Sequence, residues 1–469
     1  MTDGKCKPDE RAINRPLGIG ATRVAIYRAL HWTDGCCMSA FSATVRRDAL
    51  SLRQLADWLV VLIAIALPWS ITATEICIVA WLCAVLPTLQ KASIRQAIES
   101  ATGDLPVLLW FLAVLGMLWA DVSWTERFHG LDSFHRLLVI PLLLAQFRRS
   151  EHGSWVVCGF LVSSTALLIA SYIMILKPEL TPTNNPVGIP VHDDIFQGSL
   201  FVICSFGALG YAAAQAVRRR WLLVCAFIAI ATLFVVNFLV VSAFSRALLG
   251  VAPVLAILLG WRIARFKGVL AACLAAAALG AAFWVVSPSV RDRVHKSLDE
   301  LTEYTARNEA SSIGQHLAFL TESLKIISSA PLIGHGTGSI AKEFRQVSSG
   351  AAGAAGVVTV NPHNQTFAVA IQIGLLGAIV LWAMWIAHLR LFRHDSSIAW
   401  FGTMIVVENI VSSTVHSHLF DSAHGWLYVF GVGVLGGMVL HKRTESAVAE
   451  MDLNIRHLDS CTRRVHGED

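Results

Sequence analysis

Residues 361–385 read NPHNQTFAVAIQIGLLGAIVLWAMW, so a short polar stretch with one histidine leads directly into an apolar segment. The apolar part, Phe367 to Trp385, contains no charged residue, and a helix of about 20 such residues crosses the hydrocarbon core of a membrane. His363 therefore stands at the mouth of a predicted membrane helix. We hypothesise that the other segments form the scaffold and the substrate contacts around this histidine.

The composition of the whole chain agrees with a membrane protein. Of the 469 residues, 55% are hydrophobic and only 15% are charged, whereas soluble domains carry about 25% charged residues. The net charge of +5 comes from basic residues scattered between apolar runs, and this pattern argues against a nucleic-acid partner. The ten cysteines show no CxxC pair and no zinc spacing, which favours buried thiols over a disulfide framework.

Apolar runs follow one another along most of the chain and predict an all-α, polytopic integral membrane protein with about twelve transmembrane helices. The run over 134–147 is short for a span, so either its ends include polar neighbours or the bilayer is thinner around it. The runs lie at about 55–70, 72–89, 105–120, 134–147, 154–176, 195–216, 221–243, 247–262, 268–286, 365–387, 397–413 and 424–441.

Basic residues in the short loops predict the orientation. One set of alternate loops holds twelve of them, namely Lys91, Arg95, Arg148, Arg149, Arg218, Arg219, Arg220, Arg262, Arg265, Lys267, Arg390 and Arg393. The short loops on the other side hold only Arg127, Arg136, Lys177 and Arg246. The first side is cytoplasmic by the positive-inside rule, and both termini are then inside.

This orientation divides the chain into five segments. They are a cytoplasmic extension over 1–50, spans over 51–286, a long periplasmic loop over 287–364, spans over 365–441 and a cytoplasmic tail over 442–469. The loop is predicted to contain helices from Val290 to about Tyr304 and from about Ile313 to Ser329, the second with Ser312 as its N-cap. Its small-residue tract at 348–356 is expected to act as a flexible linker.

Two residue types in the predicted periplasmic half are candidates for carrying chemistry. The imidazole of His363 can accept a proton from a hydroxyl near neutral pH, although His363 and Asn364 could instead simply cap the following helix. Arg246 lies at the outer end of a span, where an arginine faces water or a partner or snorkels to the interface. A guanidinium fork matches phosphate oxygens, and Arg136 offers a second such contact.

Three further motifs contain residue types that occur in metal or nucleotide sites. His192-Asp193-Asp194 and His416-x-His418-x-x-Asp421-x-x-His424 contain metal-binding residue types, but neither spacing is a strong metal signature, and Asp421 fits an N-cap of the last span. Gly334-x-Gly336-x-Gly338 has no preceding strand and no following Lys-Ser/Thr, which argues against a nucleotide site. We therefore expect no metal and no cofactor, and treat Asp421 as a candidate substrate contact.

The second half resembles the O-antigen ligase and polymerase family, most closely its ligases. The resemblance rests on Ser245-Arg246-Ala247, Pro331 to Gly338, Pro362-His363-Asn364 and Gln372 to Gly377, in this order over about 240–390. It implies a GT-C-like glycosyltransferase that moves a polysaccharide from undecaprenyl pyrophosphate to a sugar hydroxyl of lipid A–core. The site would lie on the periplasmic face of the bacterial inner membrane, in contact with membrane lipids.

The resemblance also implies roles for individual residues. His363 matches the family's essential histidine and Arg246 its arginine at the membrane edge. A further arginine is expected near the start of the amphipathic loop helix, where this chain has His316, and the nearest arginine is Arg307. His316, Asn364 and Asp421 are then candidate supporting or acceptor contacts.

The same chemistry leaves several functions open. A polymerase that joins two lipid-linked repeats, and an oligosaccharide-to-protein transferase, would use the same donor and differ only in the acceptor. A twelve-span transporter without chemistry is the alternative from another class. Transporters tend to show internal repeats, none of which is visible here, so a ligase is the leading prediction.

Overall fold

The computed structural model describes residues 38–466 except 184, 243–245, 287 and 308–310, and not every side chain within these ranges. The chain divides into two units, Met1–Leu52 and Arg53–Asp469. Of the first unit, the structure describes only the beginning of one helix. The described residues of the second unit form helices and connections without strands, as predicted.

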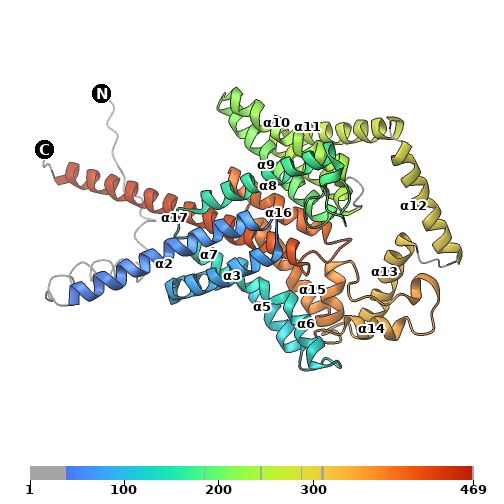
Figure 1. The fold of residues 1–469 in the computed structure, drawn as a ribbon. Coiled ribbons are helices and arrows are strands. Elements are labelled where there is room, and N and C mark those ends of the chain that lie inside the picture. Colours follow the sequence, from blue (N-terminus) through green and yellow to red (C-terminus); the bar gives the residue numbers. More distant parts are fainter. Residues whose placement is uncertain (1–37, 184, 243–245, 287, 308–310, 467–469) are drawn as a thin grey trace. The chain divides into compact units, whose positions relative to one another are not determined.

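Sixteen α-helices and several short helical turns are described (Figure 1). The α-helices are α2 Met38–Ala66, α3 Ile71–Val85, α4 Lys91–Ile98, α5 Ala101–Gly116, α6 Trp124–His135, α7 Val139–Phe147, α8 Gly153–Leu176, α9 Asp194–Val217, α10 Trp221–Asn237, α11 Arg246–Val286, α12 Pro288–Arg307, α13 Ser312–Ser329, α14 Ile340–Val347, α15 Gln365–Leu391, α16 Ser397–Ser412 and α17 Ser422–His466. The 3-10 turns are η2 Leu86–Thr88, η3 Arg136–Leu138, η4 Pro178–Leu180 and η6 Gly353–Gly356, and η5 Phe238–Ser242 is a π-helix.

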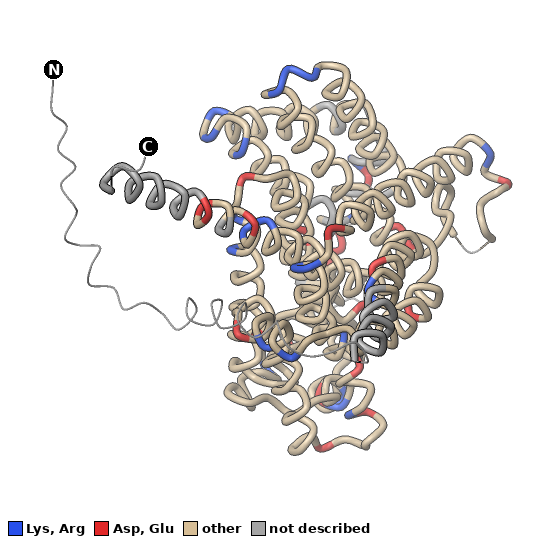
Figure 2. The backbone as a smooth tube through the Cα atoms, turned by 90° about the vertical axis from the view of Figure 1, so that its left-hand side faces the viewer, with Lys and Arg blue, Asp and Glu red and all other residues tan. Residues whose placement is uncertain are grey.

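The described helices identify a multi-pass membrane protein but do not confirm a count of twelve spans. Within the described residues, eight helices are long and apolar enough to cross a membrane, or nine if the bent pair α4–α5 is one span. The apolar helix α16 is shorter, with 16 residues. Each of the twelve predicted apolar runs overlaps a described helix. The prediction and the structure therefore differ in the number of helices that qualify as spans, and agree on where along the chain the helices lie. Figure 2 shows long uncharged stretches of helix, with Lys and Arg gathered mainly at helix ends and connections.

Two local features show how short apolar runs are built into longer helical segments. The run over 134–147 is extended by polar neighbours, as expected, because α6, η3 and α7 together form a 24-residue candidate span over Trp124–Phe147. The runs over 247–262 and 268–286 are two arms of α11, which reverses at Ala264 and Arg265. The backbones of Gly260 and Gly268 meet there so closely that a Cβ on Gly260 would lie 2.3 Å from the Gly268 oxygen. Small residues permit such close helix packing.

The helix α15 is not continuous. Gly374 has φ 70° and ψ −168°, a backbone conformation that is essentially restricted to glycine. A Cβ on Gly374 would lie 2.2 Å from the carbonyl oxygen of Leu332. The amide of Leu375 leaves the helical pattern and donates to the Pro331 oxygen at 2.8 Å. The break is therefore made by the loop that packs against it.

That loop, Pro331–Gly338, occupies the carbonyls that the break in α15 exposes. The amide of His335 donates to the Ile371 oxygen at 2.8 Å, and the amide of Gly336 donates to the Gln372 oxygen at 2.9 Å. Irregular backbone inside a membrane protein is tolerated only where such partners satisfy it. The glycine-rich motif thus supplies hydrogen-bond donors for the carbonyl groups that the break in α15 leaves without helical partners.

The other side of the Pro331–Gly338 loop is fixed to α5 and α6. The Thr337 amide donates to the Gly116 oxygen at 3.1 Å, and its hydroxyl donates to the Ala113 oxygen at 2.6 Å. Gly338 has φ 89° and lies against the backbone of Glu126. The loop consequently holds α5, α6 and α15 together beside the segment that carries His363.

The segment over 287–364 contains the two predicted helices, as α12 and α13, and the unpredicted α14. The N-cap of α13 is Ser311, whose side chain accepts from the Gly314 amide, so the assignment of Ser312 to this position is wrong by one residue. The tract at 348–356 is more ordered than a flexible linker, since it contains η6 and buries Ala354 completely. It packs on α13.

Candidate active site

The backbone that presents His363 is held in an unusual conformation. His363 has φ 53°, in the left-handed region that few residues other than glycine adopt. Its amide donates to the Asn361 side-chain oxygen at 2.9 Å, and the Asn361 amide in turn donates to the Thr359 hydroxyl at 3.0 Å. These bonds offset the strain of the left-handed backbone conformation at His363.

Asn364 is the N-cap of α15, and it also reaches a second segment. Its side-chain oxygen accepts from the Phe367 amide at 3.0 Å, which confirms the capping role considered from the sequence. Its side-chain nitrogen donates to the Thr414 oxygen at 3.0 Å. Asn364 thereby joins the start of α15 to the 413–421 loop, the connection between α16 and α17.

Aromatic rings from α13 and the 413–421 loop surround the His363 side chain. The Phe319 ring lies nearly parallel to it, with centroids 5.8 Å apart, and the His316 ring meets it edge-on at 4.9 Å. The His416 ring lies on a further side at 5.5 Å, with the two Nδ1 atoms 3.4 Å apart. His363 and His316, two of the predicted site residues, are therefore neighbours in space.

This packing keeps His363 and His416 neutral near pH 7. Burial lowers the pKa of His363 below its ordinary value of 6.5. Burial, together with the adjacent histidines, lowers the pKa of His416 to about 4. A neutral imidazole has one nitrogen with a free electron pair, so the His363 ring is in the form that can accept a proton from a hydroxyl.

Hydrogen bonds donated by main-chain amides hold the 413–421 loop on α15. The Gln365 amide donates to the Ser413 oxygen at 2.9 Å, and the Leu419 amide donates to the Gln365 side-chain oxygen at 3.0 Å. These bonds, with the Asn364 contact to Thr414, fix His416 relative to His363. The proximity of the two rings thus follows from the docking of the loop and not from their own weak contact.

Arg136 reaches the same loop from η3. It is buried, and it donates to the Phe420 oxygen at 3.2 Å, the Asp421 oxygen at 2.9 Å and the Ser422 hydroxyl at 2.9 Å. Its guanidinium also lies over the Trp426 ring. These contacts anchor the end of the loop, so the geometry of Arg136 is that of a positioning residue. A contact of Arg136 with pyrophosphate stays a prediction.

Asp421 caps α17 and pairs with His424. Its carboxylate accepts from the His424 amide at 3.0 Å, as expected for an N-cap, and lies 2.9 Å from His424 Nδ1. Burial alone would raise the pKa of Asp421, but the bonds to His424 outweigh it, and the pKa lies below its ordinary value. In the part of the chain that the structure describes, no three His, Cys, Asp or Glu side chains are arranged to hold a metal ion.

The side chains of Arg246 and Arg307, two further predicted site residues, lie outside the described residues. Sequence reasoning did not single out Phe319 or connect His416 with His363. His416 was noticed only as part of a possible metal motif. A histidine in a loop adjoining the last span, on the same predicted face as His363, was the available signal.

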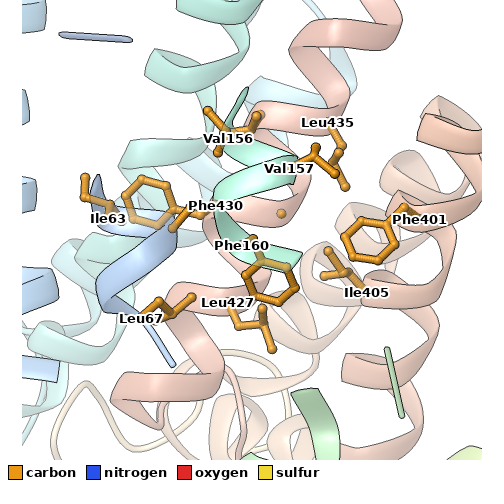
Figure 3. A pocket seen from close by; sticks show the side chains of 13 residues that line it. Ile63, Leu67, Val156, Val157, Phe160, Phe401, Ile405, Leu427, Phe430 and Leu435 are labelled. Atoms are coloured by element: carbon orange, nitrogen blue, oxygen red, sulfur yellow. The ribbon is translucent and has the colours of Figure 1, made fainter. Parts of the chain in front are cut away.

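An apolar hollow lies between α2, α8, α16 and α17 (Figure 3). Only hydrophobic residues line it, among them Leu67, Phe160, Ile405 and Phe430, and its volume is about 40 Å³. It offers no group that could bind a charged substrate or transfer a proton.

The fold and this site define the class of the protein: an all-α, multi-pass membrane protein with a neutral histidine held at the start of a broken helix. Residues 231–382 match the family model described as O-antigen ligase. This match supports an O-antigen ligase-family protein, and the family suggests a glycosyltransferase-like enzyme. The matched region includes His316, Phe319 and His363 and ends before the 413–421 loop. A comparison with curated proteins finds no match.

Proposed function

We propose that this protein transfers O-antigen polysaccharide from undecaprenyl pyrophosphate to a sugar hydroxyl of lipid A–core, at the periplasmic face of the bacterial inner membrane. The family match supports the class of reaction. The observation that carries the proposal is the setting of His363, a neutral imidazole fixed by backbone bonds and by rings from two other segments. This arrangement suits a base that must meet a hydroxyl in one orientation.

The proposed reaction is a direct displacement. The acceptor hydroxyl oxygen attacks the anomeric carbon, its proton passes to His363, and the bond from that carbon to the pyrophosphate oxygen breaks. The electron pair leaves with undecaprenyl pyrophosphate, and the anomeric centre inverts. His363 then releases its proton to water. Pyrophosphate is already a good leaving group, so the protein needs mainly to hold it and to stabilise its growing charge.

We assign the pyrophosphate contact to Arg246 first, from its place in the sequence, with Arg307 and Arg136 as further candidates. Arginine forms bidentate, charge-assisted bonds with phosphate oxygens and can stabilise the leaving group without a metal. His316 lies beside His363 near the place where the family resemblance implies an arginine. We propose that His316, Asn364 and Asp421 support or contact the acceptor.

Reconstitution tests this proposal. Purified protein supplied with lipid-linked polysaccharide and lipid A–core should yield a ladder of capped lipopolysaccharide. Elongation of a second lipid-linked repeat in place of lipid A–core would make the protein a polymerase, and transfer to a peptide would make it a protein glycosyltransferase. Uptake of the polysaccharide substrate into vesicles without any covalent product would indicate a transporter. Activity that chelators abolish would contradict the metal-independent mechanism.

A further inference from the structure

A cavity of about 430 Å³, lined by both polar and apolar residues, lies beside the segment that carries His363. Residues of α6, the end of the Pro331–Gly338 loop, the first turn of α14, the start of α15 and the end of the 413–421 loop line it. Its volume falls in the range of about 300–1,000 Å³ that is typical of small-molecule sites. It is thus large enough for a ligand, unlike the apolar hollow in Figure 3.

The charge of this cavity argues against a phosphate ligand. Two carboxylates line it, those of Glu126 and Asp421, and no lysine or arginine is among its lining residues. The side chains of Glu126 and Asp421 are 41% and 50% exposed, so both can contact a ligand. Arg345 approaches Glu126 at 3.5 Å without lining the cavity. A pyrophosphate placed there would meet like charge, which is unfavourable by several kcal/mol at about 4 Å and an effective dielectric constant near 20.

The remaining lining suits a neutral ligand with many hydroxyl groups. His129, Ser133 and Asn361 offer hydrogen-bonding groups, while Phe420 and Ile340 offer apolar surface. Carboxylates accept hydrogen bonds from hydroxyl groups, and the C–H faces of a sugar ring pack on apolar side chains. A polyprenyl chain would leave these polar groups without partners, which is costly.

The position of the cavity relative to His363 determines which part of a substrate it would hold. Asn361 and Pro362 line the cavity, whereas the His363 ring packs on Phe319 and His416. A ligand in the cavity would therefore lie next to the reacting groups and not between them. We infer that the cavity is a saccharide subsite, which holds an uncharged sugar unit adjacent to the one that reacts. This inference rests on the proposed transferase function and specifies the substrate part that this region binds.

Direct binding tests the subsite independently of turnover. Calorimetry on the purified full chain would use three probes: the lipid-free repeat-unit oligosaccharide, the lipid-free core oligosaccharide, and undecaprenyl pyrophosphate without sugar. Ser133→Trp fills the cavity, and Glu126→Gln removes one carboxylate at nearly constant size. Thr125→Trp is the matched control, because Thr125 is an exposed residue of the same helix outside the lining.

Both cavity variants should weaken the binding of one oligosaccharide at least tenfold, and the oligosaccharide affected identifies the donor or the acceptor as the source of the sugar. Binding of undecaprenyl pyrophosphate should stay within twofold in both variants. Unchanged oligosaccharide binding in both variants, or loss of undecaprenyl pyrophosphate binding, would overturn the subsite. A wild-type protein that binds oligosaccharide in the cavity but transfers none would refute the proposed reaction and leave the sugar site standing.

Discussion

The Nδ1 atoms of His363 and His416 lie 3.4 Å apart, although 53 residues separate the two histidines in the chain. Two facing Nδ1 atoms of neutral rings can share only one proton, so the tautomer of one ring determines that of the other. If His363 Nδ1 donates to His416 Nδ1, the Nε2 atom of His363 keeps its electron pair for the acceptor hydroxyl. The low pKa of His416 fits the accepting partner, because its ring stays neutral.

His416 is thus expected to act as a positioning residue for His363. His416→Leu should lower kcat by about 10- to 100-fold with little change in KM, in line with the cost of disturbing an orienting group behind a functional histidine. His416→Asn keeps an acceptor oxygen near the position of Nδ1 and should recover most of the activity. Steady-state kinetics on both variants decide the matter, and equal losses would show that His416 serves packing alone.

Removal of the base is the most direct test of the site. His363→Ala should lower kcat by about 10²- to 10⁴-fold, the usual contribution of a general base. The fold should persist, because the backbone bonds of the segment do not require the imidazole. His394→Ala is the control, since His394 is exposed in the connection between α15 and α16. An intact product ladder from His363→Ala would remove the histidine from the mechanism.

The pH dependence of transfer follows from the direction of the His363 pKa. Burial disfavours the charged imidazolium and lowers the pKa below 6.5, so the neutral base prevails at pH 7. The value of kcat/KM should stay level as the pH falls toward 6.5 and then drop about tenfold per pH unit below the lowered pKa. A profile measured between pH 5 and pH 8 checks this expectation. An acid limb with its midpoint above pH 7 would contradict it.

The break in α15 offers a stability prediction with a built-in control. Gly374→Ala places a Cβ in a glycine-only conformation and against the Leu332 oxygen, so we expect a loss of about 1–3 kcal/mol or more. Gly280→Ala should be neutral or slightly stabilising, because a Cβ there meets nothing within 4 Å. Thermal unfolding in detergent measures both. Equal midpoints for the two variants would show that the break does not depend on Gly374.

Sequence patterns anticipated the helices better than their interruptions. Hydrophobic runs located the helices because burial in lipid or in a helical core demands apolar side chains over a whole element. The break at Gly374 and the reversal at Ala264 and Arg265 depend instead on close backbone packing against other segments. A pattern along one segment contains no record of such partners, so the runs predicted helix positions but not which helices are broken.

The candidate site was predictable in part for the same reason. His363 and Asn364 belong to one local motif, and their place before an apolar run offered capping as the alternative to a functional role. The partnership of His363 with Phe319 and His416 joins α13, α15 and the 413–421 loop, which are far apart in the chain. Arg136 shows the opposite outcome. Its residue type and its place at the end of a span suggested a ligand contact, whereas in the structure it donates to carbonyl oxygens of the 413–421 loop.

These contacts of Arg136 lead to a prediction that separates two roles. If Arg136 mainly anchors the 413–421 loop, Arg136→Lys should lower the stability of the fold by about 1–3 kcal/mol, the worth of hydrogen bonds to a charged group. A lysine ammonium lacks the planar fork that reaches the Asp421 oxygen and the Ser422 hydroxyl together. His416 would then be held less firmly beside His363, and kcat would fall. If Arg136 binds pyrophosphate instead, the KM for the donor should rise while the unfolding midpoint stays near that of the wild type. Arg95→Lys, at an exposed i,i+4 pair with Glu99, is the control and should change neither quantity.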